Sequence, residues 1–362
     1  MTMNTAPRPY LLPPNVIEHF YRGGERIAAL RGHPARSASD GPLRRPEEWL
    51  GSTVERWGTD GSGLTELGAG GTLHELIAAD PQTWLGAAHV ARWGSSPALL
   101  VKLLDAGERL PVHVHPDRRF ARTHLDCPFG KTEAWVVLEV PSGGGTAFVG
   151  TTRPVRREEW AELVDDQAVD TMIELLRPLR IDVGDGVLVP ASTPHCLDAG
   201  VFVVELQEPT DFSILLEWDG FDVDGPADGH LGLGFTTALD AVRTDALGTA
   251  AVDGLVRRAA LPQAEAHPLL PLAADPYFRA WAVEAAAAPV TVPAAFSIVV
   301  ITGGAGTLRW AGGSSAIARG DALVVPHATG PLTFDGGDGG ISAVVAQPPV
   351  PDAPEPVEGA AP

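Results

Sequence analysis

Three histidines and a glutamate in the first 200 residues have the types and spacing of a metal site. His113 and His115 are separated by one residue, so on a strand both imidazoles would point to the same face. Glu133 begins the next apolar run, and His195 follows a later run and a tight turn. Imidazoles and a carboxylate are a usual ligand set for a first-row divalent metal. Four N and O ligands from three strands predict a catalytic rather than a closed structural site.

Two further residues are candidates for acid–base work beside these ligands. Lys131 stands two positions before Glu133, on the same face if the strand extends that far. A lysine beside a bound cation can stabilise a developing oxyanion or exchange protons. Glu205 and Gln207 alternate along another apolar run and would face one way. Glu205 is therefore a candidate base, with a buried, paired structural carboxylate as the other interpretation.

The elements that position these residues are predicted to be mainly β-strands. The 362 residues include 41 glycines and 33 prolines, and short runs rich in valine and leucine alternate with glycine and proline turns. This pattern favours antiparallel β structure over a helical bundle. Strands are expected at 98–105, 110–115, 134–140, 179–190, 201–208 and 212–218, and from 277 to about 347. Helices are expected after Gly23-Gly24, at 73–85, at 158–177 (as one helix or two) and at 239–260.

An internal repeat divides the chain into two similar halves. The motif Gly-Asp-x-x-x-x-Pro occurs at 184–190 and again at 320–326, 136 positions later. Its glycine is expected to have a positive φ in a turn that leads into a strand. The second half has no His-x-His, and Pro331 stands where the first half has His195. We therefore expect two β-barrel units, the second without a metal, and we expect His327 to be a structural or surface residue rather than a ligand.

The predicted organisation has four parts. Residues 1–235 form the metal-binding catalytic unit with an N-terminal extension and a helical insertion, 236–275 a helical linker, and 276–349 the degenerate second unit. The proline-rich, acidic tail at 350–362 is expected to be disordered.

Charge and composition exclude several classes of partner. A net charge of −20 argues against binding to nucleic acid or to anionic membrane surfaces. No secretory leader and no apolar run of about 18 residues are evident. Cys127 and Cys196 are the two cysteines, and Cys196 would face away from its neighbour His195 on a strand. These features predict a soluble cytoplasmic protein with a small-molecule ligand, and they leave the oligomeric state open.

The spacing Gly-x5-His-x-His, then glutamate, then Gly-x5-Pro-x4-His is similar to the cupin pattern. Beyond this, the segments ALLVKLLDAGERLPVHVHPD, FGKTEAWVVLE, VLVPASTPHCLDAG and VVELQEPTDFS resemble the type I phosphomannose isomerases, also called mannose-6-phosphate isomerases. The resemblance implies a mainly β fold of two cupin (jelly-roll) β-barrels with added helices.

The same resemblance implies a site and a reaction. It implies a Zn²⁺ ion, with Fe²⁺ or another divalent metal as alternatives, bound by the residues at His113, His115, Glu133 and His195. It implies reversible aldose–ketose isomerisation of a sugar or sugar phosphate through a cis-enediol. Lys131 and Glu205 fall on active-site positions of the family.

Three positions depart from the family pattern. The family has glutamine where His113 stands, a phosphate-associated serine where Pro111 stands, and an active-site arginine where Leu215 stands. Proline and leucine offer no side-chain donor to a phosphate. Three arginines close to His115 in sequence are candidates to replace the missing one: Arg118, Arg119 and Arg122.

Mannose 6-phosphate is the default substrate, and the departures leave three alternatives open. The first is an isomerase for an unphosphorylated or different sugar. The second is a bicupin iron dioxygenase, because replacing glutamine by His113 suits iron. The third is a sugar-binding cupin without catalysis.

Overall fold

The strands of the first half form two sheets that together hold the candidate site. The computed structural model describes residues 7–33, 43–260, 265–286 and 288–354, and its strands confirm a mainly β fold. A five-stranded antiparallel sheet has the order β12 (Ile214–Leu215), β5 (His113–Val114), β10 (His195–Leu197), β7 (Gly145–Thr151) and β8 (Leu176–Ile181).

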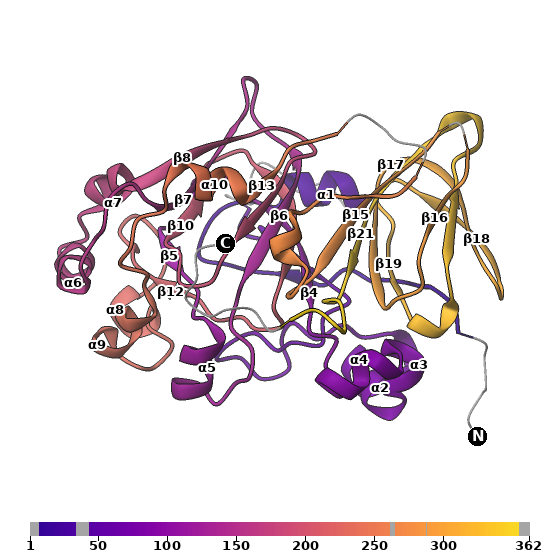
Figure 1. Cartoon of the computed structure of the whole chain (residues 1–362), viewed down its shortest axis with the longest axis horizontal. Helices are drawn as coiled ribbons and strands as arrows, with labels where there is room; N and C mark the ends of the chain where they lie inside the picture. Colours follow the sequence, from indigo (N-terminus) through magenta and orange to yellow (C-terminus); the bar gives the residue numbers. More distant parts are fainter. Residues whose placement is uncertain (1–6, 34–42, 261–264, 287, 355–362) are drawn as a thin grey trace.

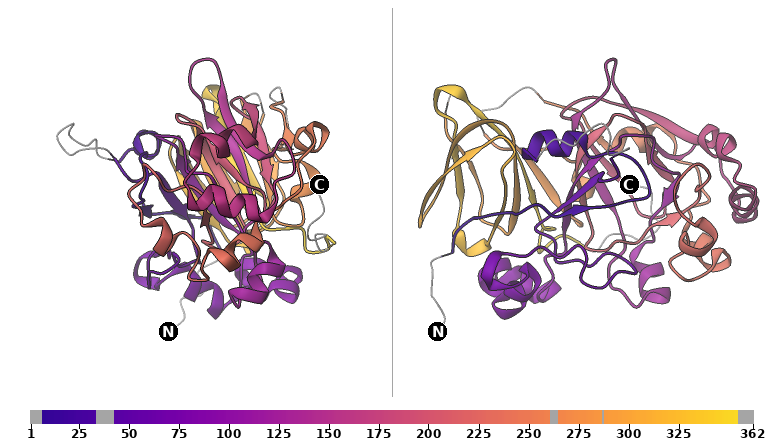
Figure 2. Two further views of the ribbon diagram at one scale, coloured as in Figure 1. Left: turned by 90° about the vertical axis from the view of Figure 1, so that its left-hand side faces the viewer. Right: turned by 180° about the vertical axis from the view of Figure 1, so that it is seen from behind.

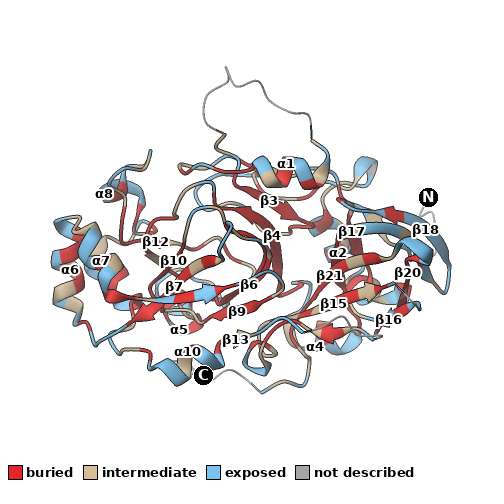
Figure 3. Cartoon of the chain, turned by 90° about the horizontal axis from the view of Figure 1, so that it is seen from above, coloured by how far each residue is buried: buried red, intermediate tan, exposed pale blue. Residues whose placement is uncertain are grey.

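The second sheet of the first half is larger and contains the most buried strands. Its order is β13 (Val256–Arg257), β9 (Gly186–Val189), β6 (Glu133–Glu139), β11 (Phe202–Gln207), β4 (Leu100–Asp105), β3 (Glu47–Leu50) and β2 (Val16–Ile17). Every residue of β4 and β11 is buried, as Figure 3 shows for the central strands of the molecule. Burial on both faces explains why both strands, LVKLLD and FVVELQ, are largely apolar, with a few buried polar side chains among the apolar ones.

The second half forms one branched sheet at the opposite end of the molecule from helices α6 to α9 (Figure 1). Its main path is β1 (Tyr10–Leu11), β19 (Ala322–Val325), β17 (Ser297–Trp310), β21 (Ile341–Gln347), β15 (Arg279–Ala285) and β14 (His267–Pro268). The branches are β16 (Val290–Val292), β18 (Gly313–Ala318) and β20 (Leu332–Asp335). This sheet encloses a hydrophobic core cluster of its own, separate from that of the first half.

The N-terminal strand β1 belongs to the second unit, although residues 1–235 were predicted as one unit. Tyr10 and Leu11 pair with Val324 and Leu323 of β19, and the Leu12 amide donates to the Ala322 carbonyl at 2.8 Å. Without β1, strand β19 would expose an unpaired edge, and covering such an edge stabilises a sheet.

Short helices surround the sheets, as the three views of Figures 1 and 2 show. They are α1 (Glu25–Arg31), α2 (Leu73–Ala79), α3 (Pro81–Leu85), α4 (Ala87–Trp93), α5 (Arg118–His124), α6 (Arg157–Asp165), α7 (Val169–Leu175), α8 (Gly225–Asp228), α9 (Phe235–Ala238) and α10 (Thr249–Gly254). Short 3₁₀ turns are η2 (Gly68–Gly70), η3 (Leu239–Ala241), η4 (Leu272–Ala274), η5 (His327–Thr329) and η6 (Gly337–Gly339). Within the described ranges, none of the helices has the length and apolar character needed to cross a membrane.

Two of the predicted helical segments are each divided in two. The segment 73–85 becomes α2 and α3, because Pro81 occupies the first turn of a new helix whose N-cap is Asp80. Thr72 and Glu75 form a capping box at the start of α2. The segment 158–177 becomes α6 and α7, and its last residues enter β8.

The predicted helix at 239–260 is wrong for most of its length. This segment forms η3, the short α10 and then β13, which pairs with β9 at the edge of the seven-stranded sheet. Leu247 packs against Gly150 of β7 and is buried. Contacts with the first unit outweigh the modest helix propensity of this alanine-rich segment.

The two copies of the repeat form the same turn. Gly184 and Gly320 have φ values of +86° and +94°, as their shared motif predicts. The Asp185 carboxylate accepts a hydrogen bond from the amide three residues before it at 3.0 Å, and Asp321 accepts the equivalent bond at 2.8 Å. Each turn leads directly into a buried strand, β9 or β19.

The start of the predicted C-terminal tail lies against α4. The Arg92 guanidinium donates hydrogen bonds to the carbonyls of Pro351 at 2.8 Å and Ala353 at 2.5 Å. The remainder of the segment predicted to be disordered, 355–362, lies outside the described residues.

The repeat provides a matched pair of variants for stability. Asp185 is buried and also accepts hydrogen bonds from Arg258 at 2.7 Å and the Ala259 amide at 2.9 Å. Asp185→Ala is expected to lower the free energy of unfolding by about 2–3 kcal/mol, because it removes three hydrogen bonds that a buried carboxylate accepts. Asp321→Ala, which removes one exposed turn bond, is expected to cost only about 0.5–1.5 kcal/mol. Chemical denaturation of the two variants measures the difference, and equal losses would contradict this account of the turn.

Candidate metal centre

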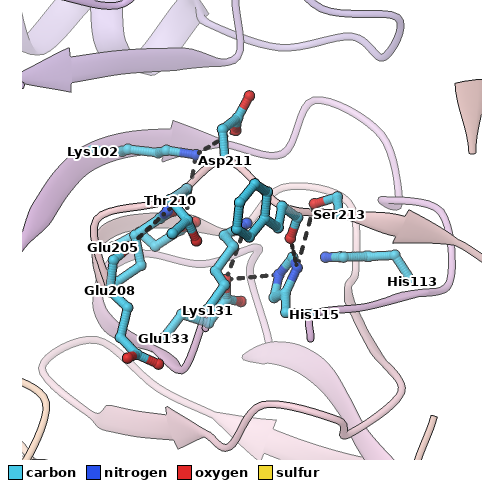
Figure 4. A network of polar contacts seen from close by, with 12 residues as sticks. Lys102, His113, His115, Lys131, Glu133, Glu205, Glu208, Thr210, Asp211 and Ser213 are labelled. Carbon is cyan, nitrogen blue, oxygen red and sulfur yellow. Dashed lines mark hydrogen bonds and ion pairs between the residues drawn. The ribbon is translucent and has the colours of Figure 1, made fainter. Parts of the chain in front are cut away.

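The four side chains predicted as metal ligands lie together between the two sheets of the first half. His195 on β10 is the direct cross-strand partner of His113 on β5, and His115 immediately follows β5. Ligand atoms of these three histidines lie within 4.8 Å of one another, so the group could hold a metal ion. Glu133, the first residue of β6, approaches from the other sheet. Figure 4 shows His113 and His115 directed toward this common point.

Main-chain carbonyls fix the orientation of all three imidazoles. Each Nδ1 lies at hydrogen-bonding distance from a carbonyl oxygen: His113 from Pro111 at 2.9 Å, His115 from Phe212 at 2.8 Å, and His195 from Thr193 at 2.7 Å. A carbonyl can only accept, so each Nδ1 carries the proton and each Nε2 of a neutral ring carries a lone pair. Carbonyl partners of this kind are typical of metal-ligating histidines.

The Nε2 atoms face a carboxylate rather than a donor. His115 Nε2 lies 2.9 Å from Glu133 Oε2, and His195 Nε2 lies 3.2 Å from Glu133 Oε1. Both Nε2 atoms are buried and have no hydrogen-bond donor. Burial lowers the pKa of His115 to about 3 and holds that of His113 well below its usual range, so these rings stay neutral. Lone pairs facing a carboxylate repel one another unless a cation lies between them, so the donor set fits a divalent metal.

Glu133 is ionised despite its burial. Desolvation opposes its ionisation, but the charge of the Lys131 ammonium group favours it, and the pKa of Glu133 is held well below the usual range. Lys131 Nζ lies 3.6 Å from Glu133 Oε2. Lys131 is itself buried just before β6, so the structure brings it to the site as the sequence predicts.

A cavity of about 580 Å³ opens onto this group. Four of the six predicted site residues line it, and the other two, His115 and His195, are buried behind them. The lining residues are His113, Lys131, Glu133 and Glu205.

Sequence reasoning missed a buried network beside the ligands. Lys102 Nζ, on β4, lies 3.1 Å from Glu47 Oε2, 3.8 Å from Asp211 Oδ1 and 4.0 Å from Glu205 Oε1. Burial lowers the pKa of Lys102, but the carboxylates of Glu47, Glu205 and Asp211 outweigh it and raise the pKa, so the ammonium stays charged. Lys102 is the one lysine in the apolar run 98–105, and this position could have indicated the network from the sequence. A charged residue in a buried strand needs a partner of opposite charge or a function.

Glu47 is fixed by aromatic donors. The Tyr21 hydroxyl donates to its Oε1 at 2.5 Å, and the Trp49 indole N–H donates to its Oε2 at 2.8 Å. This carboxylate is therefore a fixed counter-ion for Lys102, whose ammonium also lies 4.7 Å from the centre of the Trp49 ring.

Glu205 differs from the other carboxylates in its protonation. It lies opposite Lys102 in the β11–β4 pair, and its buried Oε1 has no hydrogen-bond partner. Burial and the charge of Glu133 raise its pKa to about 8. Gln207, on the same face, instead donates to the Thr210 carbonyl and is not among the residues lining the cavity.

The arginines near His115 do not replace the one that the family has at position 215. The Arg118 side chain is buried and donates to Glu208 at 2.6 Å, while Arg119 and Arg122 are exposed on α5. None of the three is among the described residues that line the cavity. Leu215 does line it, and it is buried next to α8.

Cys196 and His327 lie outside the group of proposed metal ligands. Cys196 is buried on β10, and burial raises the pKa of its thiol to about 12. His327 belongs to the second unit, and its ring packs against Gly86, the residue that precedes α4.

No family model matches this chain. It is 30% identical over 128 residues to the mannose-6-phosphate isomerase ManA of Bacillus subtilis, and 31% identical over 135 residues to the mannose-6-phosphate isomerase of Streptococcus mutans. These segments are 35% and 36% of this chain, and they span only 39% and 41% of the two relatives.

The fold similarity extends much further along the chain. The mannose 6-phosphate isomerase structure from B. subtilis superposes with a TM-score of 0.71 at 21% identity, covering 95% of this chain and all of that one. The apo form of the enzyme from Salmonella typhimurium gives 0.68 at 14% identity, covering 94% and 99%. The predicted resemblance is confirmed: the chain is similar in sequence to mannose-6-phosphate isomerases over about a third of its length, and it has their fold along nearly its whole length.

Proposed function

We propose that this protein is a metal-dependent aldose–ketose isomerase that interconverts mannose 6-phosphate and fructose 6-phosphate. The main support is the set of three carbonyl-oriented imidazoles around Glu133, beside a cavity that also contains a buried, protonatable Glu205. The names of the relatives and the shared fold support the same reaction class. A cavity of about 580 Å³ accommodates a hexose phosphate.

The proposed ligands are His113, His115, Glu133 and His195, and zinc is the proposed metal. A divalent cation held there would polarise the substrate carbonyl and bind the adjacent hydroxyl oxygen. His113 in place of the family's glutamine also suits Fe²⁺.

Glu205 is the proposed base. Its Oε1 would take the proton from C2 of the aldose and return one to C1, while a proton passes from the C2 oxygen to the C1 oxygen of the cis-enediol. Burial raises the pKa of Glu205 toward neutrality in the metal-free protein, which suits a group that accepts and returns a proton.

The two lysines of the cavity stabilise the charge that develops in this reaction. Lys102 stays charged and lies 4.0 Å from Glu205 Oε1, and Lys131 lies 3.6 Å from Glu133. Both ammonium groups are buried, where they interact with an enediolate oxygen more strongly than they would in water.

The direct test is a coupled isomerase assay with Zn²⁺ and after chelation. Metal-dependent turnover of mannose 6-phosphate is expected, with free mannose as the uncharged comparison. Turnover of free sugars alone would contradict mannose 6-phosphate as the substrate but would support the isomerase reaction. Absence of turnover with metal bound would contradict the proposal, and oxygen uptake by the Fe²⁺ form would then identify an iron oxygenase.

Removing one ligand tests the metal site. His195→Ala is expected to weaken metal binding by more than about a hundredfold and to remove activity with it, because the remaining donors leave the coordination incomplete. His327→Ala is the matched control. Because His327 belongs to the second unit, this variant should retain its full metal content. Elemental analysis of the purified variants measures the bound metal, and an active, metal-loaded His195→Ala protein would contradict the assignment.

The Glu205→Gln variant tests whether Glu205 acts as the base without being a metal ligand. Activity is expected to fall by at least about a hundredfold with metal content unchanged.

The pH dependence of stability has a defined sign. Because the pKa of Glu205 is raised to about 8 in the folded protein by burial and Glu133, against the opposing charges of Lys102 and Lys131, the neutral side chain stabilises the fold at low pH. This contribution decreases as the pH rises from about 4.5 to about 8. Metal-free Glu205→Gln should therefore lose less stability than the wild type between about pH 6 and 9, by about 2–4 °C in Tm. Parallel Tm profiles in thermal denaturation would contradict the raised pKa.

A further inference from the structure

One arginine reaches the cavity from a loop that the sequence did not connect with the site. Among the described residues that line the cavity, Arg56 is the only arginine. It lies in the loop after β3, and its side chain is partly buried. Position 215, where the family has its active-site arginine, lies in a different part of the cavity wall, on β12.

The loop that carries Arg56 is tied to the metal site. The Trp57 amide donates to Asp211 Oδ2 at 3.2 Å, and the Trp57 ring packs edge-on against Phe212 with centroids 5.2 Å apart. The Phe212 carbonyl is also the acceptor that orients His115. Two main-chain bonds close the loop, from the Arg56 amide to the Ser62 carbonyl and from the Thr59 amide to the Arg56 carbonyl. The loop that carries Arg56 is thus attached to the segment that orients a proposed metal ligand.

Arg56 is also the cavity cation without a counter-ion. Lys102 is paired with Glu47, and Lys131 with Glu133. In the part of the chain that the structure describes, the Arg56 side chain makes no ion pair or side-chain hydrogen bond. An arginine without a partner in a cavity suits a phosphate, because its planar fork of N–H donors matches two phosphate oxygens.

The wall around position 215 does not suit an anion. Leu215 and Leu231 line it with apolar surface, and the exposed Asp228 of α8 adds negative charge. Phosphate placed there would face this apolar surface and would be repelled by Asp228.

We propose that Arg56 binds the phosphate group of a sugar phosphate substrate and replaces the arginine that position 215 lacks. The substrate would then point its phosphate toward the loop after β3 and away from α8. This inference rests on the proposed function for the identity of the sugar. The anion site itself can be tested without turnover.

The test compares two polyols that cannot isomerise because they have no carbonyl group. Mannitol 6-phosphate and mannitol differ only in the phosphate, and calorimetry gives the Kd of each for the metal-loaded protein. The wild type is expected to bind mannitol 6-phosphate at least about tenfold more tightly than mannitol, as one charge-assisted hydrogen-bonded pair provides. Arg56→Gln should remove this preference, and Arg56→Lys should retain part of it.

Arg22→Gln is the matched control. It removes the same charge from an exposed side chain that pairs with Glu108 and is absent from the described cavity lining. Its phosphate preference should equal that of the wild type. Unchanged metal content and Tm in Arg56→Gln would show that its fold and metal site are intact.

Two results would overturn the inference: a wild type without phosphate preference, or an Arg56→Gln variant that keeps the full preference. Failure of the isomerase assay with the preference present and dependent on Arg56 would reject the proposed reaction and support the anion site. Turnover of free mannose alone, with no phosphate preference, would reject the anion site and support the isomerase chemistry.

Discussion

The site depends on three hydrogen bonds from imidazole Nδ1 groups to main-chain carbonyls. They fix the orientation of the rings, with Nε2 of His115 and of His195 facing Glu133, and burial keeps the rings of His113 and His115 neutral. Without a cation, this arrangement places lone pairs against a carboxylate, which is unfavourable in a buried site. The fold must therefore hold it in place. It does so with β5 and β10, which put His113 and His195 opposite each other, and with the 210–213 segment that supplies the carbonyl for His115.

Around this centre, the cavity distributes charge unequally among its carboxylates. The Glu47 carboxylate accepts hydrogen bonds from Tyr21 and Trp49 and pairs with Lys102. Glu205 Oε1, in contrast, has no hydrogen-bond partner, and the pKa of Glu205 rises to about 8. A buried carboxylate without donors reduces stability. Such local costs are typical of functional positions. The difference between Glu47 and Glu205, which lie on the same sheet and share Lys102, separates a structural counter-ion from a group able to transfer protons.

The second β unit shares the turn geometry of the first but none of its ligands. Its turn at Gly320 and Asp321 matches that at Gly184 and Asp185, and Pro331 occupies the position of His195. It has its own core, and β1 connects it to the N-terminal part of the chain. The repeated turn therefore preserves a way of starting a buried strand, while ligand residues are present in only one copy.

The sequence by itself determined most of the strands and which residues are the proposed ligands, because both depend on local patterns. Alternation put His113 and His115 on one face, and glycine in a repeated motif required a positive φ at 184 and 320. The tertiary structure alone decided which distant side chains and strands contact one another. It brought Lys102 to Glu47 and Glu205, placed Arg56 in the cavity and Arg118 against Glu208, and paired β1 with the sheet of the second unit. These contacts join residues far apart in the chain, and strand pairing and loop anchoring set them. A local pattern specifies which face a residue occupies, but not which distant side chain it meets there.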